Sequence, residues 1–315
     1  MTNVLVIGGS GMLGSMVVDV LRREPGFKIS ATVRSRAASA RLGAIFPEVD
    51  WRMLDAGSSD QIREAIAGAN WIVNAVGITK PYAHDQNAAE VENAIRINSV
   101  FPYELSAAAR NSGATVLQIA TDCVYSGQKG AYSENDPHDA LDVYGKTKSL
   151  GEALHPDTQC IRCSIVGPEM GSRNYLFEWF RSQPVGAGIK GFVNHQWNGV
   201  TTLHFGKLCA GLIKSRIALP HIQHVIPTAA ISKYELLKCF AEEFDRRDIT
   251  ITPTEAGTVV DRTLSTAHHD ANRELWRSAG YDQPPTVPQM VSELAKFMQT
   301  GSWAETAFVA ASVTT

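Results

Sequence analysis

The segment "NVLVIGGSGMLGSMVVDVLRR", residues 3–23, places a glycine-rich turn between two stretches of different character. The apolar run before the glycines predicts a buried strand, and the spacing of apolar residues after them predicts a helix. Gly8, Gly11 and Gly14 form the pattern G-x-x-G-x-x-G at this junction. Glycines there permit a tight turn and let backbone N–H groups approach a pyrophosphate at the helix N-terminus. We therefore predict a dinucleotide-binding turn, in preference to a strand–helix turn without a ligand.

The residues at the end of the next strand indicate which dinucleotide is bound. About 20 residues after the glycines, an acidic side chain would bind a free ribose 2′-hydroxyl, whereas an arginine would bind a 2′-phosphate. Arg34, Ser35 and Arg36 occupy this position, and no carboxylate accompanies them. Two arginines on a solvated loop would give the same pattern. The sequence nevertheless favours NADP(H), with NAD(H) as the second choice.

Strand-like and helical segments alternate along the first half of the chain. The segments "KISATVR" (28–34), "WIVNAVG" (71–77) and "ATVLQIATD" (114–122) have strand character, and a long helix is expected over residues 88–111. Strands that are apolar throughout, with helices between them, are typical of a parallel sheet covered on both faces. The predicted fold class is α/β, with a Rossmann-type doubly wound parallel sheet and a smaller C-terminal α/β substrate-binding lobe.

The alternation becomes irregular after Gly167, and this change sets the predicted domain boundary. Residues 1–167 would form the NADP(H)-binding domain, residues 168–300 mainly the substrate-binding lobe, and residues 301–315 a C-terminal tail. Parts of the second half are expected to rejoin the sheet. The glycines and aromatic residues of 167–202 predict a poor core and a binding region. Helices are expected at residues 203–214, 232–244 and 286–298.

Composition excludes several classes of protein. The 315 residues carry a net charge of −3, and their lysines and arginines are scattered, so nothing indicates a nucleic-acid partner. The apolar run at the N-terminus is too short for a signal peptide or a membrane span, and we expect a cytoplasmic protein without a membrane partner. The pair "CIRC" at 160–163 lacks a second ligand pair, so buried free thiols are expected and no metal site is predicted.

The segment "DVYGKTKSLGE", residues 142–152, contains a tyrosine and a lysine four positions apart. On a helix, Tyr144 and Lys148 would project from the same face. An ammonium beside a phenol lowers the pKa of the phenol and makes it a better proton donor near neutrality. Taken alone, this segment fits a solvated helix surface better than a catalytic site.

Five motifs in a fixed order carry a resemblance to a known family. They are the glycine turn, "NAVG" at 74–77, "INS" at 97–99, "TDCVYSG" at 121–127 and "YGKTK" at 144–148. In this order they are similar to the extended short-chain dehydrogenase/reductases, and most similar to the dTDP-4-dehydrorhamnose reductase family of nucleotide-sugar reductases. The resemblance implies NADPH-dependent reduction of the 4-keto group of a nucleotide-linked 4-keto-6-deoxy sugar, within polysaccharide biosynthesis.

The resemblance also implies roles for individual residues. Tyr144 would donate a proton to the substrate carbonyl as hydride arrives from the nicotinamide, and Thr121 would hydrogen-bond the same oxygen. Lys148 would lower the pKa of Tyr144 and hold the nicotinamide ribose, and Asp55 would meet the adenine. The other implied cofactor-binding residues, beyond the glycines and the arginine segment, are Met12, Leu13, Ala75, Val76, Gly77 and Asn98.

The predicted substrate side is less specific. Arg262 in "DRTLST" resembles an arginine that contacts nucleotide phosphates, although Thr263 replaces the proline expected after it. Asn194, His195, Trp197 and Asn198 gather polar and aromatic groups in one loop. Such a loop suits a sugar or base pocket, and an ordinary structured loop is an equal alternative.

Cys123 opens an alternative reaction. If residues 121–123 are extended, Thr121 and Cys123 point to the same side, so the thiol would lie beside the catalytic hydroxyls. A thiol in this position could exchange a proton on a carbon next to a ketone, which would make the protein an epimerase/reductase, with His195 as a partner. A buried, inert thiol is the favoured interpretation.

A second alternative is not enzymatic. Some proteins of the resembled family bind NADP(H) as regulatory subunits, but Thr121, Tyr144 and Lys148 would have no use in a pure binding module. The nucleotide sugar is the expected small-molecule partner, and a homodimer is compatible with the sequence.

Overall fold

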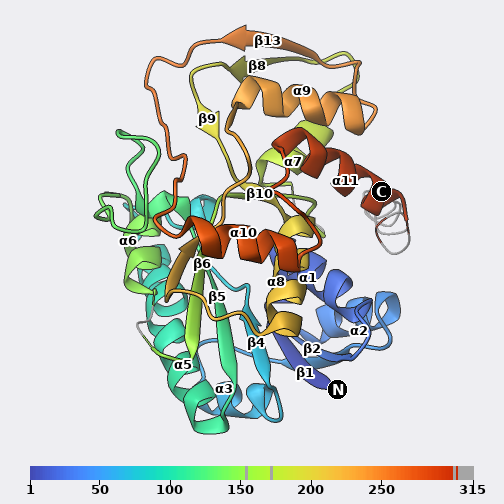
Figure 1. Ribbon diagram of the computed structural model, residues 1–315, viewed down its shortest axis with the longest axis vertical. Coiled ribbons are helices and arrows are strands. Elements are labelled where there is room, and N and C mark those ends of the chain that lie inside the picture. The colour runs from blue at the N-terminus through green and yellow to red at the C-terminus, as the bar shows by residue number, and fades with distance from the viewer. Residues whose placement is uncertain (153–154, 171–172, 301–302, 304–315) are drawn as a thin grey trace.

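The computed structural model describes residues 1–152, 155–170, 173–300 and 303 (Figure 1). The predicted tail at 301–315 therefore lies outside the described residues, apart from Trp303. No helix in the described ranges combines the length and apolar character needed to cross a bilayer. In the same ranges, no three His, Cys, Asp or Glu side chains are grouped so that they could hold a metal ion.

A parallel sheet of seven strands forms the centre of the molecule, which confirms the predicted fold class. The strand order is β11-β6-β5-β4-β1-β2-β3, and every neighbouring pair runs parallel. β1 is the strand where the order reverses, because β2 lies on one side of it and β4 on the other. The strands are β1 (Thr2–Ile7), β2 (Phe27–Val33), β3 (Asp50–Met53), β4 (Trp71–Asn74), β5 (Thr115–Ala120), β6 (Thr158–Arg162) and β11 (Ile222–His224).

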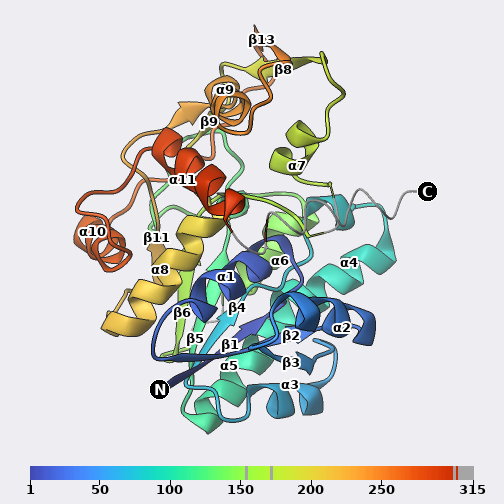
Figure 2. The same ribbon diagram turned by 90° about the vertical axis from the view of Figure 1, so that its right-hand side faces the viewer.

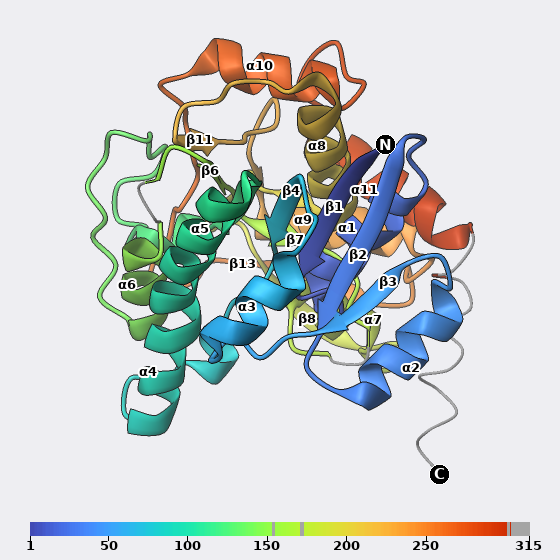
Figure 3. The same cartoon turned by 90° about the horizontal axis from the view of Figure 1, so that it is seen from below.

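Both faces of the sheet are covered, as the alternating side chains of β1 show. Val4 and Val6 belong to the cluster that includes side chains of α1 (Met12–Arg22) and α8 (Thr202–Ser215). Leu5 and Ile7 belong to the opposite cluster, with side chains of α3 (Ser59–Ile66) and α5 (Phe101–Ser112). Figure 3 shows these two helical layers with the sheet between them. The strands are therefore apolar on both faces because helices cover both faces of the sheet, as the sequence predicted.

The helix predicted over 88–111 contains an irregular segment at its middle. It consists of α4 (Ala88–Ala94), the π-helical turn η2 (Ile95–Val100) and α5. A π-helical turn inserts an extra residue and changes the direction of the side chains that follow. Its position here directs Asn98 toward α6 (Val143–Leu150), since the Asn98 amide bonds to Thr147.

The second half of the chain forms a lobe above the carboxyl ends of the strands and also returns to the sheet (Figure 2). β11 pairs with β6, and α8 packs on α1. A capping box between Ser232 and Glu235 starts α9 (Lys233–Glu243), which lies within the helix expected at residues 232–244. The domain boundaries themselves stay a prediction. The other elements of this half are β7 (Ile165–Val166), α7 (Leu176–Arg181), β8 (Gly188–Phe192), β9 (Gln196–Trp197), β10 (Val200–Thr201), β12 (Ile231–Ser232), β13 (Thr250–Thr254), α10 (His269–Ser278) and α11 (Val287–Gln299).

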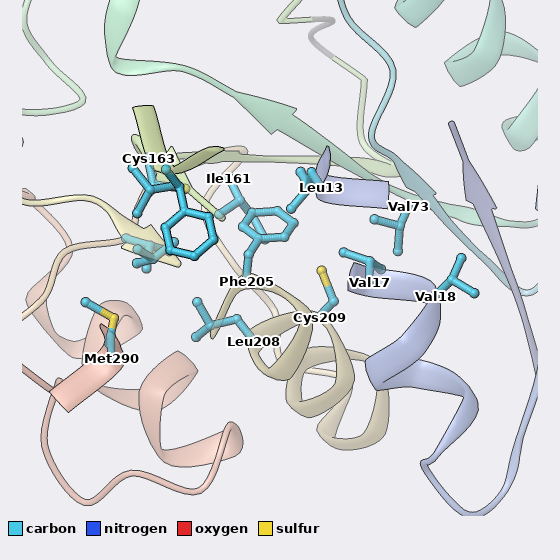
Figure 4. Packing of buried hydrophobic residues seen from close by; sticks show 14 of the residues in the cluster. Leu13, Val17, Val18, Val73, Ile161, Cys163, Phe205, Leu208, Cys209 and Met290 are labelled. Carbon is cyan, nitrogen blue, oxygen red and sulfur yellow. The ribbon is translucent and has the colours of Figure 1, made fainter. Parts of the chain in front are cut away.

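The main core extends from the sheet into this lobe. Figure 4 shows apolar side chains of α1 and α8, among them Val17 and Cys209, filling the space next to the sheet. Phe177, Phe180 and Trp197 belong to the same buried cluster. The prediction that residues 167–202 form a poor core was therefore wrong. The aromatic residues among these glycines do not repeat with the period of a helix or a strand, so the sequence did not predict a core. Each aromatic side chain nevertheless buries a large apolar surface.

Candidate active site

The glycine turn lies at the carboxyl end of β1, where the strand order reverses. Gly8 has a φ of +85°, which L-residues with a side chain rarely adopt, and its carbonyl accepts a hydrogen bond of 3.0 Å from Gly11 N. A Cβ on Gly14 would lie 2.1 Å from Gly8 O, so α1 packs this closely because Gly14 has no side chain. Open α/β sheets bind their ligands outside the carboxyl ends of the strands at such a reversal.

The end of β4 forms the other wall of this turn. Ala75 N donates to Ile7 O at 3.0 Å, and a Cβ on Gly8 would lie 2.8 Å from Val76 Cγ2. Gly77 follows, and a Cβ there would be 3.5 Å from Asn98 Oδ1. Met12 and Leu13 begin α1 directly behind the turn. The structure thus brings together the glycine turn, the "NAVG" segment and Asn98, and the close backbone approach suits a pyrophosphate.

The predicted 2′-phosphate segment lies at the end of β2. Arg34, Ser35 and Arg36 are all exposed, and Ser35 Oγ accepts a 3.2 Å hydrogen bond from Ala38 N as the N-cap of α2 (Arg36–Ile45). No salt bridge within the described ranges includes either arginine. Asp55, in the turn after β3, is exposed, and its carboxylate accepts a 2.9 Å hydrogen bond from Gly57 N. Two unpaired guanidinium groups beside a helix N-terminus fit a phosphate monoester.

Asn98 connects the cofactor side to the helix that bears Tyr144. Its amide oxygen accepts a 2.8 Å hydrogen bond from Ile78 N, and its amide nitrogen donates to Ile78 O at 2.9 Å. The same nitrogen donates to Thr147 Oγ1 at 3.1 Å. Because Asn98 is buried, these bonds hold α6 at a fixed place relative to the segment after β4.

Gly145 allows α6 to approach the end of β5. A Cβ at this position would lie 2.5 Å from Cys123 O, closer than two such atoms can come. Asp142 caps the helix by accepting a 2.7 Å hydrogen bond from Gly145 N, and it also pairs with Lys80 Nζ at 2.7 Å. The glycine after Tyr144 in the motif therefore has a packing role, which places the phenol beside Thr121.

Thr121, Cys123 and Tyr144 come together at this point. Tyr144 makes a side-chain hydrogen bond with Thr121, and the electrostatic influence of Cys123 and Asp122 reaches the phenol. Desolvation, followed by Cys123, raises the pKa of Tyr144 well above its ordinary value. Desolvation of the phenol therefore outweighs the groups that lower its pKa, and the expected lowering by Lys148 stays a prediction.

Lys148 is anchored to the backbone of β5. Its ammonium donates a 2.9 Å hydrogen bond to Ile119 O, at the end of β5, and the side chain is buried. Desolvation lowers the pKa of Lys148, although Glu152 acts in the opposite direction. The ammonium also lies near Gly77, because a Cβ on that glycine would be 4.0 Å from Lys148 Nζ. The Lys148 ammonium therefore lies between the carboxyl ends of β5 and β4.

Residues 121–124 do not form the expected extended segment. Thr121 is the N-cap of the 3-10 turn η3 (Asp122–Val124), and its hydroxyl accepts a 3.2 Å hydrogen bond from Cys123 N. Threonine is a common N-cap residue, and the prediction of an extended segment at residues 121–123 did not take this preference into account. The thiol still lies beside Tyr144, but desolvation, followed by Asp122, raises the pKa of Cys123 to about 12. A thiol with this pKa is protonated at neutral pH, so it is a weak base.

The two predicted asparagines of the substrate loop bind backbone. Asn194 donates to Ala256 O and accepts from Ala256 N, both at 2.9 Å. Asn198 donates to Leu264 O at 2.7 Å and accepts from Leu264 N at 2.9 Å. Both amides therefore hold the loop 255–266 in place. These contacts favour the structural interpretation of the loop over the sugar-pocket interpretation.

His195 and Trp197 also have contacts of their own. The half-buried imidazole of His195 bonds through Nε2 to Thr258 O at 3.0 Å, and His195 is not among the groups that influence the pKa of Cys123. Trp197 is buried and donates a 2.9 Å hydrogen bond to Ser164 Oγ. The structure therefore does not pair His195 with the thiol, and it turns Trp197 into the core of the lobe.

Arg262 lies near Asp122 and Cys123, together with a lysine that the sequence did not bring to attention. Arg262 Nε donates to Tyr125 O at 2.8 Å, and its charge influences both Asp122 and Cys123. Lys233 is influenced by the same two acidic groups and by Arg262. A cation in the first turn of a helix is electrostatically unfavourable. The position of Lys233 directly after the N-cap Ser232 is therefore unusual, and the sequence alone could have drawn attention to this residue.

Comparisons with known proteins agree with this architecture. The family model described as "RmlD substrate binding domain" matches residues 1–296. The spore coat polysaccharide biosynthesis protein SpsK of Bacillus subtilis (strain 168) is 27% identical over 296 residues, which cover 89% of this chain and 95% of that protein. The dTDP-4-dehydrorhamnose reductase of Streptomyces griseus is 32% identical over 184 residues, which cover 56% of this chain and 54% of that protein.

A solved structure shows the same fold over nearly the whole chain. The dTDP-4-dehydrorhamnose reductase of Bacillus anthracis str. Ames, determined in complex with NADP, superposes with a TM-score of 0.70 at 19% identity. The superposition covers 95% of this chain and all of that chain.

Proposed function

Because the chain belongs to the family described as RmlD substrate binding domain, we propose that it is an NADPH-dependent reductase of a nucleotide-linked 4-keto-6-deoxy sugar. The reduced group is the 4-keto group. The observation that carries this proposal is the convergence of Thr121, Tyr144 and Lys148 beside the glycine turn. Relatives named dTDP-4-dehydrorhamnose reductase support the substrate class.

The cofactor side of the proposal rests on the fit of the chain to a dinucleotide. Gly8, Gly11 and Gly14 would receive the pyrophosphate, Arg34 and Arg36 the 2′-phosphate. Met12, Leu13, Asp55, Ala75–Gly77 and Asn98 would complete the walls of this site. A bound nicotinamide would supply the hydride. The NADP complex of the Bacillus anthracis reductase supports this choice, and NAD(H) is the second choice.

Residues of the chain would then donate the proton and orient the substrate. The raised pKa of Tyr144 keeps the phenol protonated at neutral pH, so it can donate a proton to the carbonyl oxygen. Thr121, which hydrogen-bonds Tyr144, would bind the same oxygen and hold it within reach of the phenol. Lys148, anchored to Ile119 O, would hold the nicotinamide ribose against the end of β4.

A turnover assay tests the proposal. Purified protein is mixed with NADPH and a panel of dTDP-, UDP- and GDP-linked 4-keto-6-deoxy sugars, and the loss of absorbance at the NADPH band is followed. We expect oxidation of NADPH with at least one sugar, and a product reduced at C4 by mass spectrometry. Tight binding of NADPH without oxidation across the panel would instead support a regulatory subunit.

A further inference from the structure

A buried ion pair lies directly after the helix that bears Tyr144 and Lys148. Glu152 follows the end of α6, and both of its carboxylate oxygens accept hydrogen bonds from Arg162, at 3.2 Å from Nε and at 2.5 Å from Nη2. The Arg162 side chain is fully buried, and that of Glu152 is 5% exposed. A buried ion pair adds little net stability, because both charges lose their hydration. Stability alone therefore does not explain why this pair lies beside α6.

The Glu152 carboxylate is fixed from two sides. On one side, the guanidinium of Arg162 is itself held, because its Nη1 donates a 2.8 Å hydrogen bond to Tyr125 Oη. On the other side, Gly151 lets the end of α6 press against the π-helical turn, since a Cβ on Gly151 would lie 1.7 Å from Asn98 O. The close packing before Glu152 and the guanidinium after it leave the carboxylate little freedom to move.

Glu152 lies about one helical turn beyond Lys148, close enough for its charge to act on the ammonium. Glu152 N donates a 3.3 Å hydrogen bond to Ser149 O, which continues the turn past the end of α6. Lys148 is buried as well, and no salt bridge in the described ranges includes it. Desolvation lowers the pKa of Lys148, and Glu152 and the Cys160 thiol of β6 raise it. Charges interact over longer distances in a buried site than in water.

The uncharged groups around this pair do not supply the same effect. Desolvation raises the pKa of Cys160 to about 12, so its thiol carries no charge at neutral pH. His138 Nε2 lies 3.7 Å from Glu152 Oε2, but desolvation lowers the pKa of this imidazole, which is therefore neutral. Desolvation also lowers the pKa of His224 to about 4 and raises that of Tyr125, so both are neutral. Glu152 is therefore the charged group that acts on the buried ammonium.

We propose that Glu152 is a positioning residue that keeps the ammonium of Lys148 charged, while Arg162 holds the carboxylate in place. This rests on the proposed function, in which Lys148 holds the nicotinamide ribose. A charged donor makes hydrogen bonds that are roughly twice as strong as those of a neutral one. An uncharged amine would therefore bind less firmly both to Ile119 O and to a ribose hydroxyl. In this assignment Glu152 acts through Lys148 and not on the substrate.

Nuclear magnetic resonance of protein labelled with ¹³C at the ε carbon of lysine tests this inference without any substrate. The signal of Lys148 is identified by its absence in Lys148→Met, and its shift is followed as the pH is raised. Glu152→Gln and Arg162→Met break the same ion pair, but only the first removes the negative charge. Glu64→Gln, at an exposed position of α3, is the matched control for the loss of one carboxylate.

We expect Glu152→Gln to lower the midpoint of the Lys148 titration by about one to three pH units, the range for a nearby opposite charge. Arg162→Met should leave the midpoint unchanged or raise it, because the carboxylate remains. The alkaline limb of the pH profile of kcat/KM should move with the midpoint. The pKa of Tyr144 is raised well above its ordinary value, so Lys148 is the group expected to lose its proton on this limb.

The double variant Glu152→Gln/Arg162→Met separates the effect of charge from that of structure, because it leaves no buried charge unpaired. We expect it to titrate like Glu152→Gln. A midpoint restored to that of the unmodified protein, or an equal downward shift in both single variants, would show that the pair serves only the fold and would overturn the inference. A Lys148 that is already neutral at neutral pH in the unmodified protein would overturn it without any variant.

These outcomes are distinct from a failure of the proposed function. The titration of Lys148 needs neither substrate nor turnover, so each of its results stands whatever the reaction is. The proposed function fails instead if the unmodified protein oxidises NADPH with no sugar of the panel.

Discussion

Residues 121–151 and the loop 194–198 both carry polar side chains above the carboxyl ends of the strands, but they use them differently. In the first region, Tyr144 and Thr121 bond to each other at the pocket. In the second, the Asn194 and Asn198 amides each donate one hydrogen bond to the backbone of the loop 255–266 and accept one from it. These paired bonds fix both amides against the loop, although each amide keeps one N–H and one lone pair. The difference separates the side chains to which we assign the chemistry from side chains that hold the loop 255–266 in place.

Replacing Tyr144 by Phe should have the largest effect. The change removes the phenol proton and keeps the ring, so kcat for carbonyl reduction should fall about 10²- to 10⁴-fold. The dissociation constant for NADPH, measured by fluorescence titration, should change little. Tyr103→Phe is a suitable control, because Tyr103 is exposed on α5. Turnover of Tyr144→Phe within a few-fold of the unmodified enzyme would remove Tyr144 from the mechanism.

Neutralising Arg34 and Arg36 should have the next largest effect. Each guanidinium would contribute a charge-assisted hydrogen bond to the 2′-phosphate, so the double alanine variant should lose about 10- to 100-fold of its preference for NADPH over NADH. The measured quantity is the ratio of kcat/KM for the two cofactors. Arg41→Ala controls for the loss of charge, because Arg41 is exposed on α2. An unmodified enzyme that prefers NADH would contradict the assignment directly.

Asn198→Ala tests the second region. The variant loses both hydrogen bonds to the Leu264 backbone and leaves two backbone groups without partners, so the free energy of unfolding should fall by about 1–3 kcal/mol. Urea denaturation measures this change, and Asn111→Ala, at an exposed position of α5, provides the control. Since Asn198 holds a wall, kcat at saturating substrate should stay within a few-fold. Unchanged stability with lost substrate binding would make Asn198 a ligand group instead.

Cys123→Ser should have the smallest effect. A pKa of about 12 leaves about one thiol in 10⁵ ionised at pH 7, too few for efficient exchange of a carbon-bound proton. We expect turnover within about threefold of the unmodified enzyme. In D₂O, neither protein should place deuterium at C3 or C5 of the product beyond an enzyme-free control. Deuterium in the product of the unmodified protein, absent with Cys123→Ser, would establish an epimerising reaction.

The sequence predicted the parts of the molecule that depend on local order along the chain. The glycine turn, the parallel sheet and the cap at Ser232 each follow from neighbouring residues, and the structure confirms their geometry. Gly145 shows the limit of this reasoning. Its motif was recognised, but the sequence does not show why position 145 is a glycine. A Cβ there would lie 2.5 Å from Cys123 O, which belongs to another segment.

The missed features all depend on contacts between distant segments. Lys233 lies near Asp122 and Cys123 because β12 pairs with β9 and carries the start of α9 toward Trp197. The raised pKa of Tyr144 depends on burial of the phenol and on Cys123 of another segment, and the spacing of residues on one helix predicts neither. The Asn194 and Asn198 contacts lie 62 and 66 residues away in the chain.

The return of the chain to the sheet has a consequence for exchanging substrate lobes between relatives. β11 completes the edge beside β6, and α8 lies so close to α1 that a Cβ on Gly206 would be 2.9 Å from Val20 Cγ2. A chimera joined once, after residue 167, would combine an edge strand and a covering helix from one parent with a sheet from the other. An exposed strand edge readily pairs with other chains. Recombination therefore needs separate junctions on each side of α8 and β11, so that both stay with the sheet of their own parent.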